Sequence, residues 1–271
     1  MANIIEVTDI TIEELNIYTG LSEVALLRYF EPQPGIFIAE SPKVIERGLM
    51  AGYEPISVLM QAESNKEDEK LVLEKVGDVP VYKAKEEILS KIKGFALTRG
   101  MMCAMRRKPL PVMADILKGA RRIAVLENVV NPTNIGAIVR SAAALNMDGI
   151  IFSKNCCNPL YRRAIRVSMG TIFQIPWTFA EQWPKEGMEF LREQGFKTVA
   201  MALKEDSLQI EDKQLASQDK LAVLLGAEGD GLSNETLDMC DYTVCIPMSH
   251  GVDSLNVAAA SAIAFWQLGN K

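Results

Sequence analysis

Three polar segments of this 271-residue chain have residue types and spacing that could support chemistry, and each follows an apolar stretch. The first runs from Asn134 to Arg140 and has a glycine two positions after the asparagine. The second, residues 225–232, reads LGAEGDGL, and the third, residues 246–256, reads IPMSHGVDSLN. Amide, hydroxyl, carboxylate and guanidinium groups can orient a substrate, and glycines let a ligand approach the backbone closely. The three segments together therefore predict a binding or catalytic site.

The glycine-containing segment does not have the spacing of a dinucleotide-binding loop. Its pattern is G-x-x-G-x-G, whereas dinucleotide-binding enzymes use G-x-G-x-x-G with an acidic residue about 20 positions later. No phosphate-binding lysine follows the segment either. These differences argue against a nucleotide-dependent enzyme of Rossmann type.

His250 is the only histidine of the chain and lies within the third segment. Imidazole is a common general base near neutral pH, so His250 is a candidate proton acceptor. We favour the simpler interpretation, in which His250 is a loop residue that faces solvent.

The composition is typical of a globular protein, with 48% hydrophobic and 24% charged residues. A net charge of −6 argues against a protein that coats nucleic acid indiscriminately. Phosphate binding requires only local positive charge, however, and two stretches rich in arginine, around residues 106 and 162, provide it.

The five cysteines form no C-x-x-C pair and show no zinc-site spacing, which favours reduced thiols in the cytoplasm and no metal. The first residues lack the features of a secretory signal, and no apolar run is long enough to span a membrane. We therefore expect a cytoplasmic protein without a membrane partner.

The elements that must position the polar segments alternate between strands and helices. Residues 1–107 read as a small α/β domain, residues 108–118 as a proline-containing linker, and residues 119–271 as a second α/β domain. The charged run at residues 65–70 reads as a loop.

Within the second domain, apolar runs such as residues 197–201 and 221–225 predict strands of a parallel sheet that is covered on both faces. Ligands of such sheets bind outside the carboxyl ends of the strands. Since the polar segments follow strands, we expect them to converge there.

In this order, the three segments resemble the SpoU (TrmH) family of RNA 2′-O-ribose methyltransferases within the SPOUT superfamily. The shared patterns are N-x-G-x-x-x-R, G-A-E-G-x-G-L, and I-P-M followed by S-L-N-V, and they span about residues 120–271. Residues 163–175 also resemble the connecting helix of the family. The departures are small: Ala227 and Ala258 stand where serine is common, and Asp253 where glutamate is common.

The resemblance implies a parallel sheet with a C-terminal trefoil knot, preceded by a small domain that binds the RNA substrate, and it implies a homodimer through the methyltransferase domain. It implies catalytic roles for Asn134, Arg140, Glu228, Ser254 and Asn256. It implies S-adenosyl-L-methionine as cofactor, held by Leu225, Gly226, Gly231, Ile246, Met248, Leu255 and Asn256. Our candidate RNA contacts are Arg106, Arg107, Arg162 and Arg166.

The implied reaction is methyl transfer to a ribose 2′-hydroxyl of structured RNA, either ribosomal or transfer RNA. The guanidinium of Arg140 stays charged because its pKa lies above about 12, so it is a poor base. We expect it to stabilise the developing alkoxide and to hold the neighbouring phosphate, while Ser254 and Asn256 orient the ribose. The alternative is a catalytically inactive RNA-binding or ribosome-assembly protein with the same fold, which would not bind the cofactor.

Overall fold

Apolar runs of the sequence form two sheets, and each sheet organises one of two compact units. The computed structural model describes residues 3–64, 66–91, 100–204 and 206–270. Unit 1 comprises Met1–Pro109 and Leu160–Phe173, and unit 2 comprises Leu110–Pro159 and Gln174–Lys271. The units thus differ from the two contiguous domains expected from the sequence, because residues 160–173 pack with the N-terminal sheet.

Unit 1 contains a mixed sheet in the strand order β1-β4-β3-β5-β2, in which β5 runs antiparallel to β2 and β3. Its strands are β1 (Asn3–Val7), β2 (Ile36–Glu40), β3 (Pro55–Gln61), β4 (Pro80–Ala84) and β5 (Met101–Arg106). Its helices are η1 (Glu13–Leu15), α1 (Asn16–Thr19), α2 (Glu23–Leu27), α3 (Pro42–Met50), α4 (Glu67–Lys75), α5 (Glu86–Leu89), α8 (Arg162–Val167) and η3 (Thr171–Phe173).

The expectation of a loop at residues 65–70 is wrong, because α4 begins at Glu67. Three acidic residues occupy its first turn and Lys75 its last, an arrangement that complements the helix dipole. Val72 is buried and anchors the helix to the unit. The dense charge of this stretch therefore stabilises a helix and does not prevent one.

Unit 2 contains a parallel sheet in the strand order β10-β12-β9-β11-β6-β7-β8, and this confirms the predicted parallel sheet. Its strands are β6 (Arg122–Leu126), β7 (Gly149–Ser153), β8 (Trp177–Ala180), β9 (Lys197–Met201), β10 (Leu208–Gln209), β11 (Leu221–Leu225) and β12 (Tyr242–Cys245). Its helices are α6 (Met113–Leu117), α7 (Pro132–Ala144), α9 (Lys185–Glu193), α10 (Lys213–Ala216), α11 (Asn234–Met239) and α12 (Val257–Leu268).

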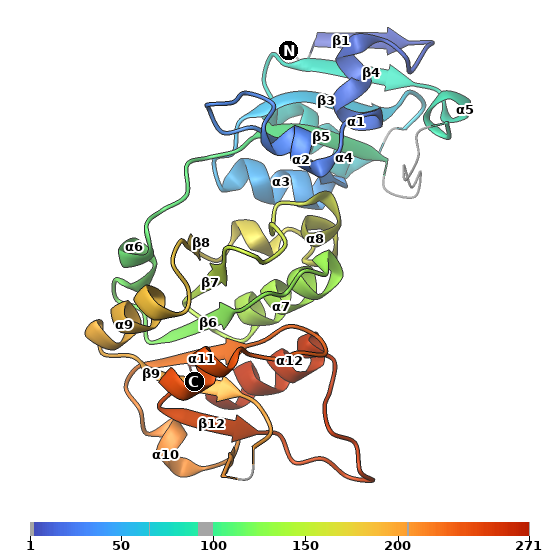
Figure 1. Ribbon diagram of the computed structural model, residues 1–271. Coiled ribbons are helices and arrows are strands. Elements are labelled where there is room, and N and C mark those ends of the chain that lie inside the picture. Colours follow the sequence, from blue (N-terminus) through green and yellow to red (C-terminus); the bar gives the residue numbers. More distant parts are fainter. Residues whose placement is uncertain (1–2, 65, 92–99, 205, 271) are drawn as a thin grey trace. The chain divides into compact units, whose positions relative to one another are not determined.

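Helices cover both faces of the unit 2 sheet, with α7 and α12 side by side on one face and α6, α9 and α11 on the other (Figure 1). Strands β6, β7 and β11 are buried along their whole length, as this coverage requires. Helix α7 buries Ile135, Ile138, Val139 and Ala142, whose spacing forms one apolar stripe.

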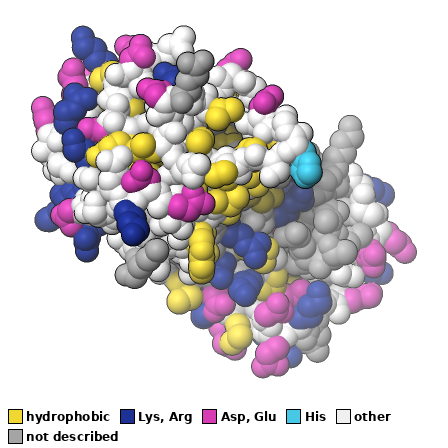
Figure 2. All heavy atoms as spheres, turned by 90° about the horizontal axis from the view of Figure 1, so that it is seen from below, with side chains coloured by type: hydrophobic (Ala, Val, Ile, Leu, Met, Phe, Trp, Pro, Cys, Tyr) yellow, Lys and Arg dark blue, Asp and Glu magenta, His cyan; other side chains and the backbone are white. Residues whose placement is uncertain are grey.

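The surface carries charges of both signs. Figure 2 shows basic and acidic side chains interspersed on the face seen from below, with hydrophobic side chains at several places between them. None of the helices that the structure describes is long and apolar enough to cross a membrane.

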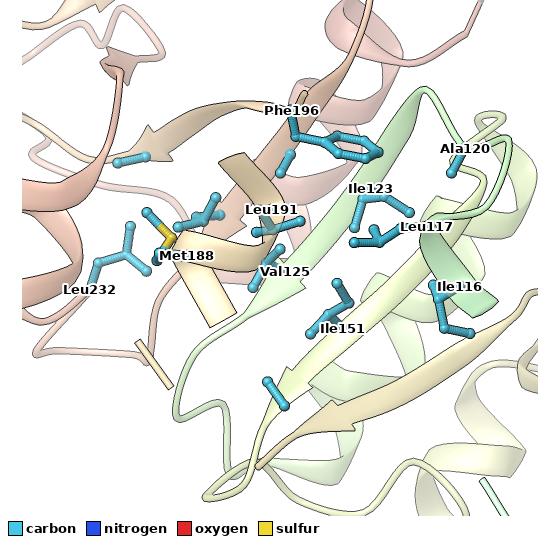
Figure 3. Close-up of a cluster of buried hydrophobic side chains, with 14 residues drawn as sticks. Ile116, Leu117, Ala120, Ile123, Val125, Ile151, Met188, Leu191, Phe196 and Leu232 are labelled. Atoms are coloured by element: carbon cyan, nitrogen blue, oxygen red, sulfur yellow. The ribbon is translucent and has the colours of Figure 1, made fainter. Parts of the chain in front are cut away.

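The core under α6 and α9 extends to the end of β11. Figure 3 shows this cluster, in which Met188 and Leu191 of α9 lie against sheet residues such as Val125. Leu232, the last residue of the glycine-containing segment, belongs to the same cluster and is buried. The loop that carries the predicted site is therefore anchored in the core at its far end.

Candidate active site

A cavity of about 640 Å³ opens at the carboxyl ends of β9, β11 and β12. The segments that follow β11 and β12 line it, as the position of ligands in parallel sheets predicts. The lining includes all of the predicted cofactor-binding residues: Leu225, Gly226, Gly231, Ile246, Met248, Leu255 and Asn256. Glu228 and Ser254 of the predicted catalytic set also line it.

The segment after β9 forms a third wall that the motifs did not indicate. Its lining residues are Met201, Ala202, Leu203 and Lys204. Strand β9 lies between β11 and β12 in the sheet, so its carboxyl end must open at the same cavity. The only sequence signal for these residues is their position directly after an apolar strand.

The glycine loop, defined as residues 226–232, folds back on itself. Ala227 and Gly231 exchange two backbone hydrogen bonds of 3.1 Å, which close the loop. A Cβ atom on Gly226 would lie 2.1 Å from the carbonyl carbon of Gly231 and 2.3 Å from the nitrogen of Leu232. Only glycine fits at this crossing, and Glu228 lies in the stretch between the two hydrogen-bonded residues.

The third segment ends at a helix cap. Asn256 is the N-cap of α12, and its side-chain oxygen accepts a hydrogen bond of 3.0 Å from the backbone nitrogen of Ala258. Ser254 lies two residues before the cap and is exposed at the cavity. The cap fixes the orientation of the Asn256 amide.

Three of the predicted catalytic residues form one hydrogen-bonded cluster. Asn134 and Asn256 donate from their Nδ2 atoms to the same oxygen of Glu228, Oε1, at 2.5 Å and 2.6 Å. Asn256 Nδ2 also lies 3.3 Å from Asn134 Oδ1. Asn134 is buried in the first turn of α7, while Glu228 and Asn256 are exposed at the cavity. The cluster thus joins all three polar segments of the sequence.

Arg140 does not join this cluster within one chain. It lies on α7, six residues after Asn134, and its side chain is exposed. Among the described residues, no hydrogen bond or ion pair to Arg140 is present, and it does not line the cavity. Its guanidinium is therefore available to a group from outside the chain.

His250 lies in an exposed turn of the third segment, with a positive φ of 59°. It does not line the cavity. This position agrees with the solvent-facing loop residue that we favoured.

Arg106 and Arg107 lie next to each other at the end of β5 and differ in environment. Arg106 is exposed, with its guanidinium 4.4 Å from the ring centre of Phe30 and 3.7 Å from a carboxylate oxygen of Glu54. Arg107 is buried, and this burial lowers the pKa of its guanidinium to about 10. Of the two, Arg106 has the geometry for contact with a phosphate.

Arg162 and Arg166 are held by a buried carboxylate of unit 1. Both side chains of α8 reach Glu40 at the end of β2, Arg162 through Nε and Arg166 through Nη1 at 3.8 Å. The side chain of Glu40 is only 5% exposed, whereas the arginine side chains are 21% and 29% exposed. These arginines therefore attach α8 to the sheet of unit 1, a role that the sequence did not indicate.

The part of the chain that the structure describes contains no group of three or more histidine, cysteine, aspartate or glutamate side chains that could hold a metal ion. The cavity instead combines an apolar wall, which includes Leu225, Val244 and Leu255, with the carboxylates of Glu228, Asp230 and Asp253. Such a lining suits a ligand that is partly apolar and partly cationic.

Comparison with known proteins agrees with this site. The sequence pattern of the SpoU rRNA Methylase family matches residues 121–266. An uncharacterized tRNA/rRNA methyltransferase of Mycobacterium bovis is 41% identical over 233 residues, which cover 86% of this chain and 80% of that protein. The 23S rRNA (guanosine-2′-O-)-methyltransferase RlmB of Acinetobacter baylyi is 27% identical over 194 residues, or 70% of this chain and 77% of that protein.

The fold has a close counterpart among solved structures. The crystal structure of an rRNA methyltransferase from Sinorhizobium meliloti with bound AdoMet superposes with a TM-score of 0.80 and 23% sequence identity, covering 98% of this chain and 97% of that chain. The family match extends over more than half of the chain, and the Mycobacterium relative covers most of both proteins. The chain therefore belongs to the SpoU rRNA methylase family.

Proposed function

We propose that this protein transfers a methyl group from S-adenosyl-L-methionine to a ribose 2′-hydroxyl of structured RNA, ribosomal or transfer RNA. The observation that carries the proposal is the cluster of Asn134, Glu228 and Asn256, of which Glu228 and Asn256 line the cavity together with the glycine loop. The 2′-O specificity in the name of the Acinetobacter relative supports the choice of the acceptor hydroxyl.

The cavity lining fits the proposed cofactor. Gly226 and Gly231 leave the backbone of the loop open to a ligand, and Leu225, Ile246 and Leu255 offer apolar surface to an adenine. The carboxylates of Glu228, Asp230 and Asp253 suit a ligand with cationic groups. When bound, S-adenosyl-L-methionine supplies a methyl carbon that its sulfonium makes electrophilic.

The protein contributes positioning and charge to this transfer. Glu228 Oε1 accepts from both asparagine amides, and Asn256 Oδ1 is engaged by the Ala258 amide, so the three side chains are fixed relative to one another. Orientation of this kind can supply several kcal/mol of a reaction barrier. Asn256 and Ser254 orient the ribose, and Arg140, which does not line the cavity of its own chain, would stabilise the developing alkoxide and hold the adjacent phosphate from the partner subunit of the proposed homodimer.

A trefoil knot at the C-terminal end forms part of the proposal. Strand β12 follows β11 in the chain but lies beyond β9 in the sheet, and α12 then returns to pack against α7 and β11. This returning path, together with the tight crossing at Gly226, supports a threaded chain. Such a fold departs from the usual absence of knots in proteins.

We further propose a homodimer through unit 2 and a cytoplasmic location. Helix α12 leaves Ile263 and Trp266 exposed, and a partner subunit would cover them. The five cysteines are free, as expected in a reducing compartment.

The decisive experiment maps 2′-O-methyl sites in total RNA from cells with and without the gene, followed by methylation of the identified RNA by the purified protein. Loss of one site in the deletion, restored by the wild-type gene and not by an Asn134→Ala variant, is the expected result. Identical methylation maps would refute the proposal. The alternative of an inactive RNA-binding protein predicts in addition that calorimetry detects no binding of S-adenosyl-L-methionine.

A further inference from the structure

We infer that Glu127 is a positioning residue that holds the glycine loop in the shape that binds the cofactor; this inference rests on the proposed function. Glu127 directly follows β6, the neighbour of β11 in the sheet, and does not line the cavity. It would therefore act through the loop and not through contact with the cofactor.

The carboxylate of Glu127 accepts three hydrogen bonds although Glu127 is only 2% exposed. Oε1 accepts from the backbone nitrogen of Ser233 at 2.9 Å. Oε2 accepts from Trp183 Nε1 at 2.8 Å and from the hydroxyl of Thr236. All three partners are donors, and the two carboxylate oxygens accept all three hydrogen bonds.

Glu127 holds both ends of the glycine loop. Its backbone nitrogen donates a hydrogen bond of 2.9 Å to the carbonyl of Leu225, the last residue of β11 before the loop. Its carboxylate receives the amide of Ser233, the first residue after the loop. One residue therefore sets the distance between the two ends of residues 226–232.

The same carboxylate also fixes the start of α11, the helix after the loop. Ser233 is the N-cap of α11, and the hydroxyl of Thr236 in the first turn of this helix also contacts Glu127. Leu232, the last residue of the loop, is buried in the core beside Met188 (Figure 3). Loss of the carboxylate would leave three donors without this acceptor, among them the buried hydroxyl of Thr236, a costly state that the loop can relieve by moving.

Trp183 provides a direct reporter of this contact, because its indole nitrogen donates to the carboxylate. Asp241 provides a matched control. It also accepts three hydrogen bonds, from Lys197 Nζ at 2.8 Å and from the backbone nitrogen and hydroxyl of Thr198 at 2.9 Å each. It precedes β12, at the end of the sheet opposite the cavity.

The test measures binding of S-adenosyl-L-methionine by calorimetry and steady-state methylation kinetics for the wild-type chain, Glu127→Gln and Asp241→Asn. We expect Glu127→Gln to raise the Kd and the KM for the cofactor about tenfold, with the KM for RNA unchanged and kcat at saturating cofactor within about threefold. The fluorescence of Trp183 should shift in Glu127→Gln, judged against a Trp183→Phe background. Asp241→Asn should bind the cofactor like the wild type.

A cofactor Kd within twofold of the wild type in folded Glu127→Gln would overturn the inference, and so would an equal rise in Asp241→Asn. Should Glu127→Gln not fold, Thr236→Val and Trp183→Phe each remove one donor, and each is expected to raise the Kd two- to threefold; unchanged values in both variants overturn the inference. Failure of the wild-type chain to bind the cofactor would instead refute the proposed function, and the inference with it.

Discussion

The carboxylate of Glu228 is shared by two amides that stand 94 and 28 residues away in the sequence. Because both amides donate to the same oxygen, Oε1, neither can rotate without losing a charge-assisted hydrogen bond. The second carboxylate oxygen and one hydrogen of Asn134 Nδ2 have no partner among the described residues. These are the groups of the cluster that remain for a substrate.

The charge of Glu228 is testable by an isosteric change. Glu228→Gln should lower turnover by about a hundredfold, because an uncharged acceptor orients the two amides less firmly and one of its two groups becomes a donor. The Kd for S-adenosyl-L-methionine should change by less than about threefold. Steady-state kinetics and calorimetry check both values. Glu235→Gln, an exposed change on α11, is the control and should leave turnover unchanged.

Arg140 is the residue whose role depends most on geometry. Arg140→Lys keeps the positive charge but loses the planar fork that can hold a phosphate and an alkoxide together, so turnover should fall about ten- to a hundredfold. Methylation rates at saturating RNA measure the effect. Near-normal turnover in this variant would contradict a geometric role. The exposed Arg192 of α9 offers a control, and Arg192→Lys should be neutral.

At the scale of elements, the glycine loop is the part of the site that is least tolerant of substitution. Gly226→Ala would put a methyl group within 2.1 Å of the Gly231 backbone, so the loop could not close, and binding of S-adenosyl-L-methionine should be lost. Gly119→Ala, outside the cavity lining, separates this effect from simple backbone strain. Gly119 has a positive φ of 76°, but a methyl group added there would meet nothing within 4 Å, so its variant should lose only about 1 kcal/mol of stability and keep cofactor binding.

The contacts between α8 and β2 are a second feature at this scale, and their contribution to stability can be measured. Glu40→Gln removes the charge of the buried carboxylate that Arg162 and Arg166 contact, and the free energy of unfolding should fall by about 3 kcal/mol in a denaturant titration. The exposed pair of Glu181 with Lys154 is the matched control, and Glu181→Gln should cost less than about 1 kcal/mol. Equal losses in the two variants would argue against a structural role for the buried pair.

The sequence predicts those helices and strands whose conformation depends mainly on the residues within them. Strand β11 begins and ends at the predicted residues, because its uninterrupted apolar run favours a sheet covered on both faces. The sequence does not predict helix α4, because its charges stabilise a helix only through their positions relative to its ends. The packing of α8 on β2 depends on Arg162 and Glu40, which are 122 residues apart, and no local pattern encodes that contact.

The same distinction applies to the site. The motifs identify Asn134, Glu228 and Asn256, but their meeting at one oxygen follows from the strand order and from the closed loop. The wall after β9 and the contacts of Glu127 carry no motif, since ordinary residues serve there through position alone. The sequence therefore identifies site residues that belong to a motif, and it does not identify residues that contribute to the site only through their position in the fold.

At the scale of the whole molecule, α12 exposes apolar surface that a partner subunit would bury. The helix is apolar on nearly all sides, and a helix of this kind is normally buried, yet Trp266 is 74% exposed in the single chain. If the proposed homodimer forms through α12, Trp266→Glu should shift the protein from dimer to monomer in light scattering coupled to gel filtration. Met50→Glu, a change of a residue that is 78% exposed on α3, should leave the mass unchanged.

The exchange of Leu160–Phe173 into unit 1 means that the polypeptide passes between the two units three times. A protease that nicks the chain near Pro109 would therefore not release an N-terminal fragment, because residues 160–173 of the other fragment would still be packed within unit 1. A fragment that ends at Pro109 would also lack Arg162 and Arg166. The buried carboxylate of Glu40 would then lose both of these ion-pair partners, which is unfavourable. Neither unit can therefore be separated intact, for example for fusion to another protein, by dividing the chain at a single point.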